Sequence, residues 1–177
     1  MTSIRIGISG WRYIGWRNSF YPPNLVQARE LAFASRALQT IEINGSHYAL
    51  QTPKSYLVWH AATLANFMFS VKAPRYVTHI LRLRDGESAI ANFFASGLFN
   101  LQEKLGPILW QFPPSFSCDE TSFEAFFKFL PTDTEAALKV ARKHDTHIEN
   151  PCLEIDQKRP LRHAIEVRHP SFFRTRL

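Results

Sequence analysis

The sequence predicts an α/β fold, a parallel (β/α) barrel of the TIM type that stops after its fifth strand. Short apolar runs typical of strands alternate with segments of helical spacing along all 177 residues, and this alternation requires a parallel sheet with right-handed crossovers. Polar residues recur on one face of the strands, as they do where inward side chains of a barrel form a site. Five such units are present, and three more of about 30 residues each would complete a barrel of eight.

Five runs can be placed on the same two-residue alternation. The expected strands are Ile4–Ser9, Thr40–Tyr48, Phe67–Lys72, Ile108–Phe112 and Ala164–Arg168. One face of each run is apolar, so we expect that face, which includes Ile4, Ile6 and Ile8 in the first run, to lie under helices. The other face collects polar residues near the C-terminal ends of the strands: Ser9, Glu42, Asn44, Ser70, Lys72, Gln111, Glu166 and Arg168.

Helices are expected between these strands. The expected ranges are Leu25–Leu38, a helix that begins at Pro53, Glu87–Leu105, Thr121–Leu130 and Asp133–His144. Proline suits the first turn of a helix because its missing N–H would have no partner there, and the pair Gly106 and Pro107 ends the third helix. The segment Thr146–Pro160 is polar and bounded by proline, which predicts a loop.

The composition indicates a single domain that spans residues 1–177. A hydrophobic content of 45% can fill one core, and no apolar run approaches the roughly 20 residues that cross a bilayer, so no membrane partner is expected. The first residues read as a strand rather than a signal sequence, and Cys118 and Cys152 lack the spacing of a metal clip. We therefore expect a cytoplasmic protein.

Five sequence blocks stand in order along the chain: GWRYIGW with FYPP, EINGSHY, FSVKAPRYVTH, KLGPILWQFPPSF and AIEVRHPSF. Together they resemble the DUF72 (YecE-like) family of TIM-barrel proteins, whose biochemical activity is not established. The resemblance implies a barrel with its site at the C-terminal rim, of which this chain matches the first five eighths. That barrel is similar to those of sugar isomerases and endonuclease-IV-like enzymes, which bind divalent metals at the same rim. His47 stands where the family usually has Phe.

Glu42 and Glu166 are the candidate catalytic carboxylates. Two carboxylates across a barrel mouth can divide acid and base roles or hold a cation. The alternative is structural: Lys72 and Arg168 share their face and would neutralise them, and losses on removing carboxylates with shared partners would not be additive. Lys72 is the third catalytic candidate, as an amine nucleophile if it is desolvated, although two glutamates on its face favour a charged lysine.

The candidate substrate-binding residues end or follow the strands: Ser9, Trp11, Asn44, Tyr48, Gln111, Arg168 and His169. Aromatic rings in such positions can stack on a sugar or a base, or pack beneath the loop, and packing is the interpretation for Trp16. Gln111 stands between two buried aromatic residues, so its amide needs a Glu, a Lys or a ligand as partner. We expect no cofactor; a divalent metal is the alternative if His47, His169 and His79 join the carboxylates.

Two hypotheses on function remain. One is an enzyme that acts on a small polar substrate, sugar-like or phosphorylated, at the C-terminal rim. The other is a non-catalytic binding protein for an anionic ligand or nucleic acid, which the net charge of +6 allows, although a solvated basic surface explains that charge as well. Because five strands leave the first and the fifth with unpaired backbone groups, we also expect self-association through these edges.

Overall fold

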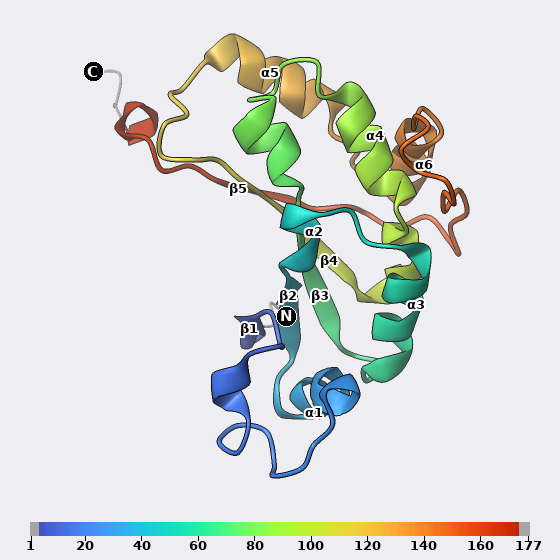
Figure 1. The fold of residues 1–177 in the computed structure, drawn as a ribbon. Coiled ribbons are helices and arrows are strands. Elements are labelled where there is room, and N and C mark those ends of the chain that lie inside the picture. The colour runs from blue at the N-terminus through green and yellow to red at the C-terminus, as the bar shows by residue number, and fades with distance from the viewer. Residues whose placement is uncertain (1–3, 174–177) are drawn as a thin grey trace.

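The computed structural model describes residues 4–173, which build one sheet of five parallel strands (Figure 1). The strands are β1 (Gly7–Ser9), β2 (Thr40–Ile43), β3 (Met68–Lys72), β4 (Leu105–Gln111) and β5 (His163–Glu166). They are neighbours in the order of the sequence, and each neighbouring pair is parallel. This is the strand order of a (β/α) barrel. Within the described residues β1 and β5 do not pair with each other, so the sheet has two edges.

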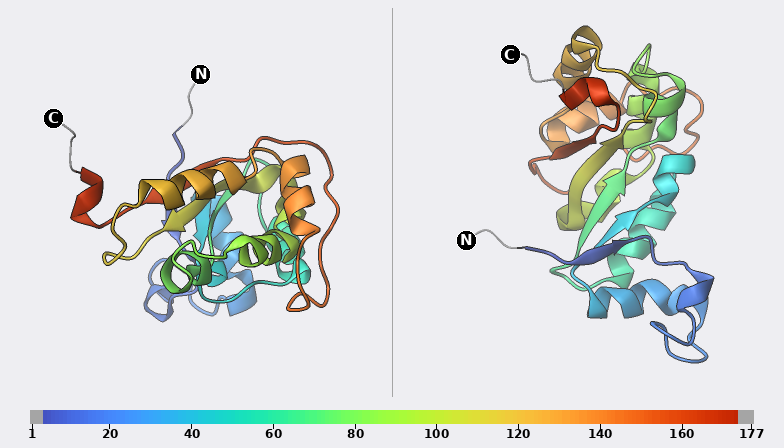
Figure 2. Two further views of the ribbon diagram at one scale, coloured as in Figure 1. Left: turned by 90° about the horizontal axis from the view of Figure 1, so that it is seen from above. Right: turned by 90° about the vertical axis from the view of Figure 1, so that its left-hand side faces the viewer.

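Helices fill the connections between the strands. The α-helices are α1 (Glu30–Ala37), α2 (Gly45–Tyr48), α3 (Pro53–Ala62), α4 (Glu87–Ala95), α5 (Glu120–Phe129) and α6 (Thr134–Ala141). Shorter helical turns are η1 (Ile14–Trp16), η2 (Gln27–Arg29), η3 (Tyr76–Ile80), η4 (Leu98–Lys104) and η5 (Pro170–Phe173). Figure 1 shows α1, α3, α4 and α6 along one side of the sheet, and the right-hand view of Figure 2 looks onto the strands from the other side. None of the described helices has the length and apolar character needed to cross a membrane.

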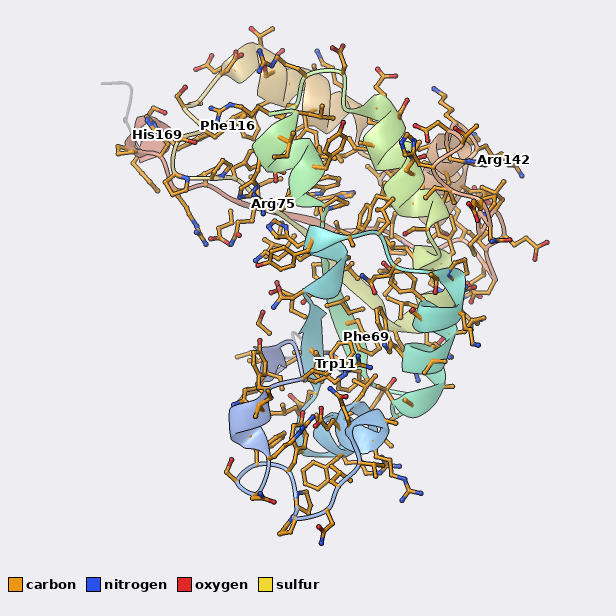
Figure 3. The ribbon with its side chains drawn as sticks, viewed as in Figure 1. Trp11, Phe69, Arg75, Phe116, Arg142 and His169 are labelled. Carbon is orange, nitrogen blue, oxygen red and sulfur yellow. The ribbon has the colours of Figure 1, made fainter. Side chains whose placement is uncertain are left out.

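Burial alternates residue by residue along the three central strands. Ile41 of β2, Phe69 of β3 and Trp110 of β4 are fully buried and join the helices in one hydrophobic cluster. Phe69 is labelled in Figure 3. Between them stand partly exposed residues such as Glu42 and Gln111. The predicted alternation is therefore confirmed: one face of the sheet forms the core, and the other is partly exposed and carries the predicted polar residues beside apolar ones such as Met68 and Leu109.

The first strand is shorter than predicted. It begins at Gly7, and Ile4 and Ile6, expected under helices, are 85% and 71% exposed; only Ile8 packs on the core. Ile6 instead bonds Gln39, which stands directly before β2. The prediction of helix cover was wrong here because alternation decides which face a side chain takes, whereas the cover depends on where the helices end.

The predicted helix Glu87–Leu105 is broken at Gly97, where α4 gives way to the 3-10 helix η4. Gly97 has a φ of +122°, and a Cβ at this position would lie 2.6 Å from the Cα of Pro53. Only glycine combines this backbone conformation with so close an approach. The break therefore seats the N-terminus of α3 against the chain between α4 and η4. Strand β4 begins at Leu105, three residues before its predicted start at Ile108.

The helix predicted over Leu25–Leu38 begins only at Glu30, as α1, where no side chain caps it. Helices α3, α5 and α6 begin close to their predicted positions because capping residues define them. Thr52, Asp119 and Asp133 precede α3, α5 and α6, and each accepts a hydrogen bond through its side chain from the backbone N–H three residues later. The predicted loop over 146–160 contains no strand or helix.

Candidate functional site

The predicted site residues lie on one face of the sheet. The register pairs Ser9 with Glu42, Lys72 with Leu109, and Gln111 with Glu166. Since partners on neighbouring strands project to the same side, the prediction that these polar residues share a face is confirmed. We call the following set the polar rim: Ser9, Glu42, Asn44, Lys72, Gln111, Glu166 and Arg168.

Glu42 has only neutral partners. Ser9 Oγ donates to Glu42 Oε1 at 2.7 Å, and Asn44 Nδ2 donates to that same hydroxyl oxygen at 2.6 Å. The backbone N–H of Gly10 bonds the carbonyl of Glu42 at 2.9 Å, which holds the end of β1 against β2. Among residues 4–173 no cation contacts this carboxylate, and its Oε2 atom has no hydrogen-bond partner.

Glu166 is fully engaged. Gln111 Nε2 donates to Oε2 at 2.7 Å, while Arg168 donates to Oε1 through Nε at 2.7 Å and through Nη2 at 2.5 Å. Burial acts to raise the pKa of Glu166, but the bonds from Gln111 and Arg168 outweigh it and hold the pKa below its usual value. Two predictions are confirmed here: a partner for the Gln111 amide, and a contact between a carboxylate and a cation of this face.

Lys72 ends β3 and makes no such contact. Ser46 Oγ donates to its carbonyl at 2.6 Å and so holds the backbone in place, but the ammonium group has no hydrogen bond or ion pair within the described residues. The two carboxylates therefore share no partner. The structural alternative, in which lysine and arginine neutralise the two glutamates, describes Glu166 and is wrong for Glu42.

The strand predicted over Thr40–Tyr48 ends at Ile43, and the single helical turn α2 follows. This turn brings His47 against the end of β3, where its Nδ1 lies 2.9 Å from the carbonyl oxygen of Ala73 and its ring is only 6% exposed. His79, on the π-helical turn η3, lies beside it with ring centroids 5.3 Å apart. The sequence offered His79 beside His47 only as a possible metal ligand; the contact of the two rings depends on the turn that replaces the end of the strand.

The possible metal ligands do not converge. No three side chains of His, Cys, Asp or Glu gather into a metal-binding group anywhere in residues 4–173. His169, expected near the carboxylates, bonds Ser171 through Nδ1 at 2.8 Å, directly after β5. The alternative of a divalent metal therefore lacks a ligand set in the described part of the chain.

The aromatic candidates separate into packed and exposed rings. Trp11 is 8% exposed and lies edge-on to Trp59 of α3, with ring centroids 5.4 Å apart. Its ring therefore belongs to the core, and the prediction that it lies at the rim was wrong. Trp16 packs against Phe20 as predicted. Tyr48 is 74% exposed and touches the His47 ring edge-on. It is the aromatic candidate that remains open to a ligand.

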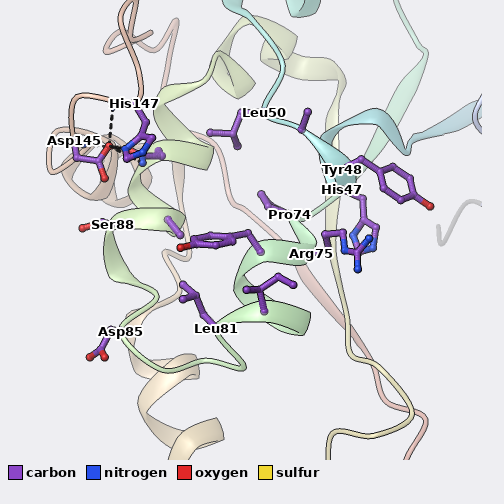
Figure 4. Close-up of a pocket in the computed structure, with 15 residues that line it drawn as sticks. His47, Tyr48, Leu50, Pro74, Arg75, Leu81, Asp85, Ser88, Asp145 and His147 are labelled. Atoms are coloured by element: carbon purple, nitrogen blue, oxygen red, sulfur yellow. Dashed lines mark hydrogen bonds and ion pairs between the residues drawn. The ribbon is translucent and has the colours of Figure 1, made fainter.

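A cavity of about 640 Å³ lies next to His47 (Figure 4). Its wall includes His47, Tyr48, Arg75, Leu81 and Asp145, and none of Glu42, Lys72 or Glu166 lines it. The volume suits a small molecule, but the carboxylate of Glu42 and the ammonium of Lys72, neither of which has an ion-pair partner in residues 4–173, lie on the rim, so the rim is the candidate site. The sequence did not indicate this cavity, because segments distant along the chain build its wall.

The sequence profile of a family described as "Protein of unknown function DUF72" matches residues 5–177. This chain belongs to the DUF72 family. The resemblance seen in the sequence blocks is thus confirmed. The UPF0759 protein YunF of Bacillus subtilis is 32% identical over 120 residues, which are 65% of this chain and 42% of YunF.

Crystal structures of two DUF72 family proteins share the fold. The protein of Thermotoga maritima has a TM-score of 0.66 at 23% identity, with 97% of this chain and 58% of that chain covered. The protein of Enterococcus faecalis has a TM-score of 0.64 at 19% identity, with 97% and 53% covered. This DUF72 chain therefore spans little more than half of either structure, and the likeness concerns the arrangement of the backbone.

Proposed function

We propose that the polar rim binds a small polar molecule, sugar-like or phosphorylated, and that Glu42 exchanges a proton with it. One observation supports this most. The carboxylate of Glu42 and the ammonium of Lys72 lie on neighbouring strands, on the same face of the sheet, and neither has an ion-pair partner in residues 4–173. Both are half-buried, and partly desolvated charges without partners cost stability. Such groups are typical of binding and catalytic sites.

Each member of the rim has a separate role in this proposal. The free Oε2 of Glu42 accepts a proton from a hydroxyl group of the ligand, while Ser9 and Asn44 hold the carboxylate in position. Lys72 attracts the anionic group of the ligand. Glu166 already bonds Gln111 and Arg168, so it orients the ligand rather than exchanging protons.

A binding protein for nucleic acid or another anion is the second candidate. The favouring observation is a set of exposed basic and aromatic side chains beside the cavity, namely Arg75, Tyr48 and Tyr76, of which the tyrosines are 74% and 53% exposed. Aromatic rings next to cations bind single strands by stacking. Binding to DNA phosphates weakens steeply with added salt, whereas a sugar phosphate seated on one lysine shows a shallow dependence.

A thermal-shift titration of the 177-residue chain tests the first proposal. Ribose 5-phosphate and ribose serve as probes, with the Lys72→Met variant and a matched control, Lys54→Met, at an exposed position of α3. We expect ribose 5-phosphate to stabilise the wild type and the control, and to bind about 10- to 100-fold more weakly to Lys72→Met, the usual cost of a charge-assisted bond. Equal binding by all three proteins would contradict a rim site. A steep loss of oligonucleotide binding with salt would favour the second candidate.

The two edges of the sheet offer a binding surface for a second copy of the chain. We infer that copies of the chain associate through β1 and β5, because within the described residues each strand has a neighbour on one side only. Sedimentation velocity is expected to show dimers or larger species, and a monomer across a wide concentration range would contradict this inference.

The cytoplasm is the compartment that we propose. Cys118 and Cys152 are both free thiols, the first exposed and the second half-buried. Thiols persist in this form in a reducing compartment. Quantifying the chain in separated cell fractions tests this location.

A further inference from the structure

Two histidines meet where β2 and β3 end. The rings of His47 and His79 lie edge to face, with planes at 79° and centroids 5.3 Å apart. The carbonyl oxygen of Ala73 fixes the proton of neutral His47 on Nδ1, and Thr78 Oγ1 lies 2.8 Å from Nδ1 of His79. The Nε2 atom of each ring has no protein partner in residues 4–173, and neither atom is sealed from solvent. Both rings therefore present a free nitrogen to a ligand.

The charged groups around His47 come from two strands. Lys72 ends β3, Arg75 follows it, and Glu42 of β2 is the single anion that acts on this ring. Burial lowers the pKa of His47, the bond to Ala73 opposes this, and the two cations lower it further. His47 is consequently neutral near pH 7.

The permanent charges that act on His79 are the cations Arg75, Arg168 and Lys72. Burial lowers its pKa first, and His47, when protonated, and these three cations lower it further. Of these cations, Arg168 is occupied by Glu166, whereas Lys72 and Arg75 make no hydrogen bond or ion pair with any described residue. The positive charges of Lys72 and Arg75 therefore disfavour protonation of both histidines in the absence of an anion.

Cationic groups gathered around a pair of free ring nitrogens are arranged to receive an anion. We propose that His47, His79, Lys72 and Arg75 form a subsite for a doubly charged oxyanion of the phosphate-monoester class, and that the anion is taken up together with a proton on the histidine pair. This subsite rests on the proposed function, since it assigns the anionic end of the substrate to the end of β3. The remainder of the substrate then extends toward Glu42.

The direction of the pH dependence follows from the charges. A dianion favours the protonated histidine, so the pKa of the pair is higher in the bound state than in the free state. Binding is therefore strongest below the free-state pKa and weakens as the pH rises toward the bound-state pKa. For one proton taken up, affinity falls about tenfold for each pH unit between these two values.

Sulfate is the probe for this subsite because it keeps its double charge between about pH 5.5 and 8, where histidine titrates. Histidine ring signals in NMR spectra give both the dissociation constant and the pKa of each ring. We expect the sulfate affinity to fall about tenfold per pH unit within this range, and the pKa of His47 or His79 to rise when sulfate is saturating. An affinity that does not change with pH would overturn the proposal.

Three variants identify the residues responsible. His47→Phe and His79→Gln are each expected to abolish the pH dependence and to leave weak binding through Lys72 and Arg75. His60→Gln is the matched control, because His60 lies on α3 and bonds Glu103 at 3.1 Å, and it is expected to bind sulfate as the wild type does. If His47→Phe fails to fold, His79→Gln decides. Wild-type pH dependence in His79→Gln, or its loss in His60→Gln, would contradict the assignment.

The two proposals can fail separately. If ribose 5-phosphate binds in a manner sensitive to Lys72→Met while sulfate binding is independent of pH, the rim site stands and the proton-linked subsite is wrong. Sulfate could instead raise the histidine pKa values while ribose 5-phosphate shows no binding that is sensitive to Lys72→Met. In that case the subsite binds anions but not the proposed substrate, and the proposed function is wrong.

Discussion

The two carboxylates of the polar rim share a sheet face but differ in environment. Glu166, near one edge of the sheet, bonds an arginine and a glutamine, and its pKa is lowered as a result. Glu42, on β2, bonds a serine hydroxyl and leaves one oxygen without a protein partner in residues 4–173. The same residue type on the same face therefore has two environments: Glu166 is held by protein partners, whereas Glu42 keeps one oxygen available to a ligand.

Position along the strands explains the difference. Arg168 follows Glu166 by two residues, so both side chains leave the chain on the same side and meet. The register partner of Glu42 on β3 is Ser70, and Lys72 stands two residues beyond it, which is about 6–7 Å further along the strand. That offset keeps the ammonium of Lys72 out of contact with the carboxylate of Glu42.

The largest expected difference between the two carboxylates is in turnover. With a ribose 5-phosphate type of substrate, Glu42→Gln is expected to lower kcat by about 10²- to 10⁴-fold, because it removes the proton acceptor. Glu166→Gln is expected to act mainly on KM, since that carboxylate already bonds two protein groups. Steady-state kinetics of both variants check this. A larger loss of kcat in Glu166→Gln would reverse the roles assigned to the two carboxylates.

Removing Arg168 should make Glu166 resemble Glu42. In Arg168→Met the pKa of Glu166 is expected to rise, because burial is then opposed only by Gln111 and the more distant Lys72. Carboxylate NMR titration measures this change. A depressed pKa adds stability that is lost as the pH falls below the ordinary value of 4.5, so the wild type should lose more stability on acidification than the variant. An identical acid response in both proteins would show that the arginine does not stabilise this carboxylate.

Stability measurements test whether the two environments are separate. Glu166→Gln is expected to reduce the free energy of unfolding by about 1 kcal/mol or less, as partly exposed ion pairs do, whereas Glu42→Gln removes a charge without an ion-pair partner and should leave it unchanged or slightly higher. In the double variant the two changes should add within about 0.5 kcal/mol, because the carboxylates share no partner. Chemical denaturation of the singles and the double decides, and a coupling well above that limit would show that the two ends of the rim act on each other.

The smallest expected effect concerns the support of Glu42. Ser9→Ala removes the donor to Glu42 and the acceptor of Asn44. Because the site is exposed, we expect a loss of about 1 kcal/mol or less. Ser117→Ala, at an exposed position beyond β4, is the matched control in the same denaturation series. A loss no larger than in this control would mean that the serine contributes nothing to the rim.

The α/β class, the strand order and the face that each central side chain takes could be predicted from the sequence. These are local properties: a two-residue alternation places Glu42 opposite Ile41 whatever surrounds the strand, and Thr52, Asp119 and Asp133 start helices through bonds to their own backbone. The match of Gln111 with Glu166 was also foreseeable, since an amide on a buried strand requires a partner.

Which of these groups come into contact depends on the tertiary structure. The helical break at Gly97 depends on the approach of Pro53 from another connection, and the burial of Trp11 depends on Trp59 of α3. Likewise, the choice of Arg168 rather than Lys72 as a carboxylate partner follows from the register between strands, and the contact of His47 with His79 from the turn α2. Such distances between remote segments are set by packing, which the pattern along a single strand or helix does not contain.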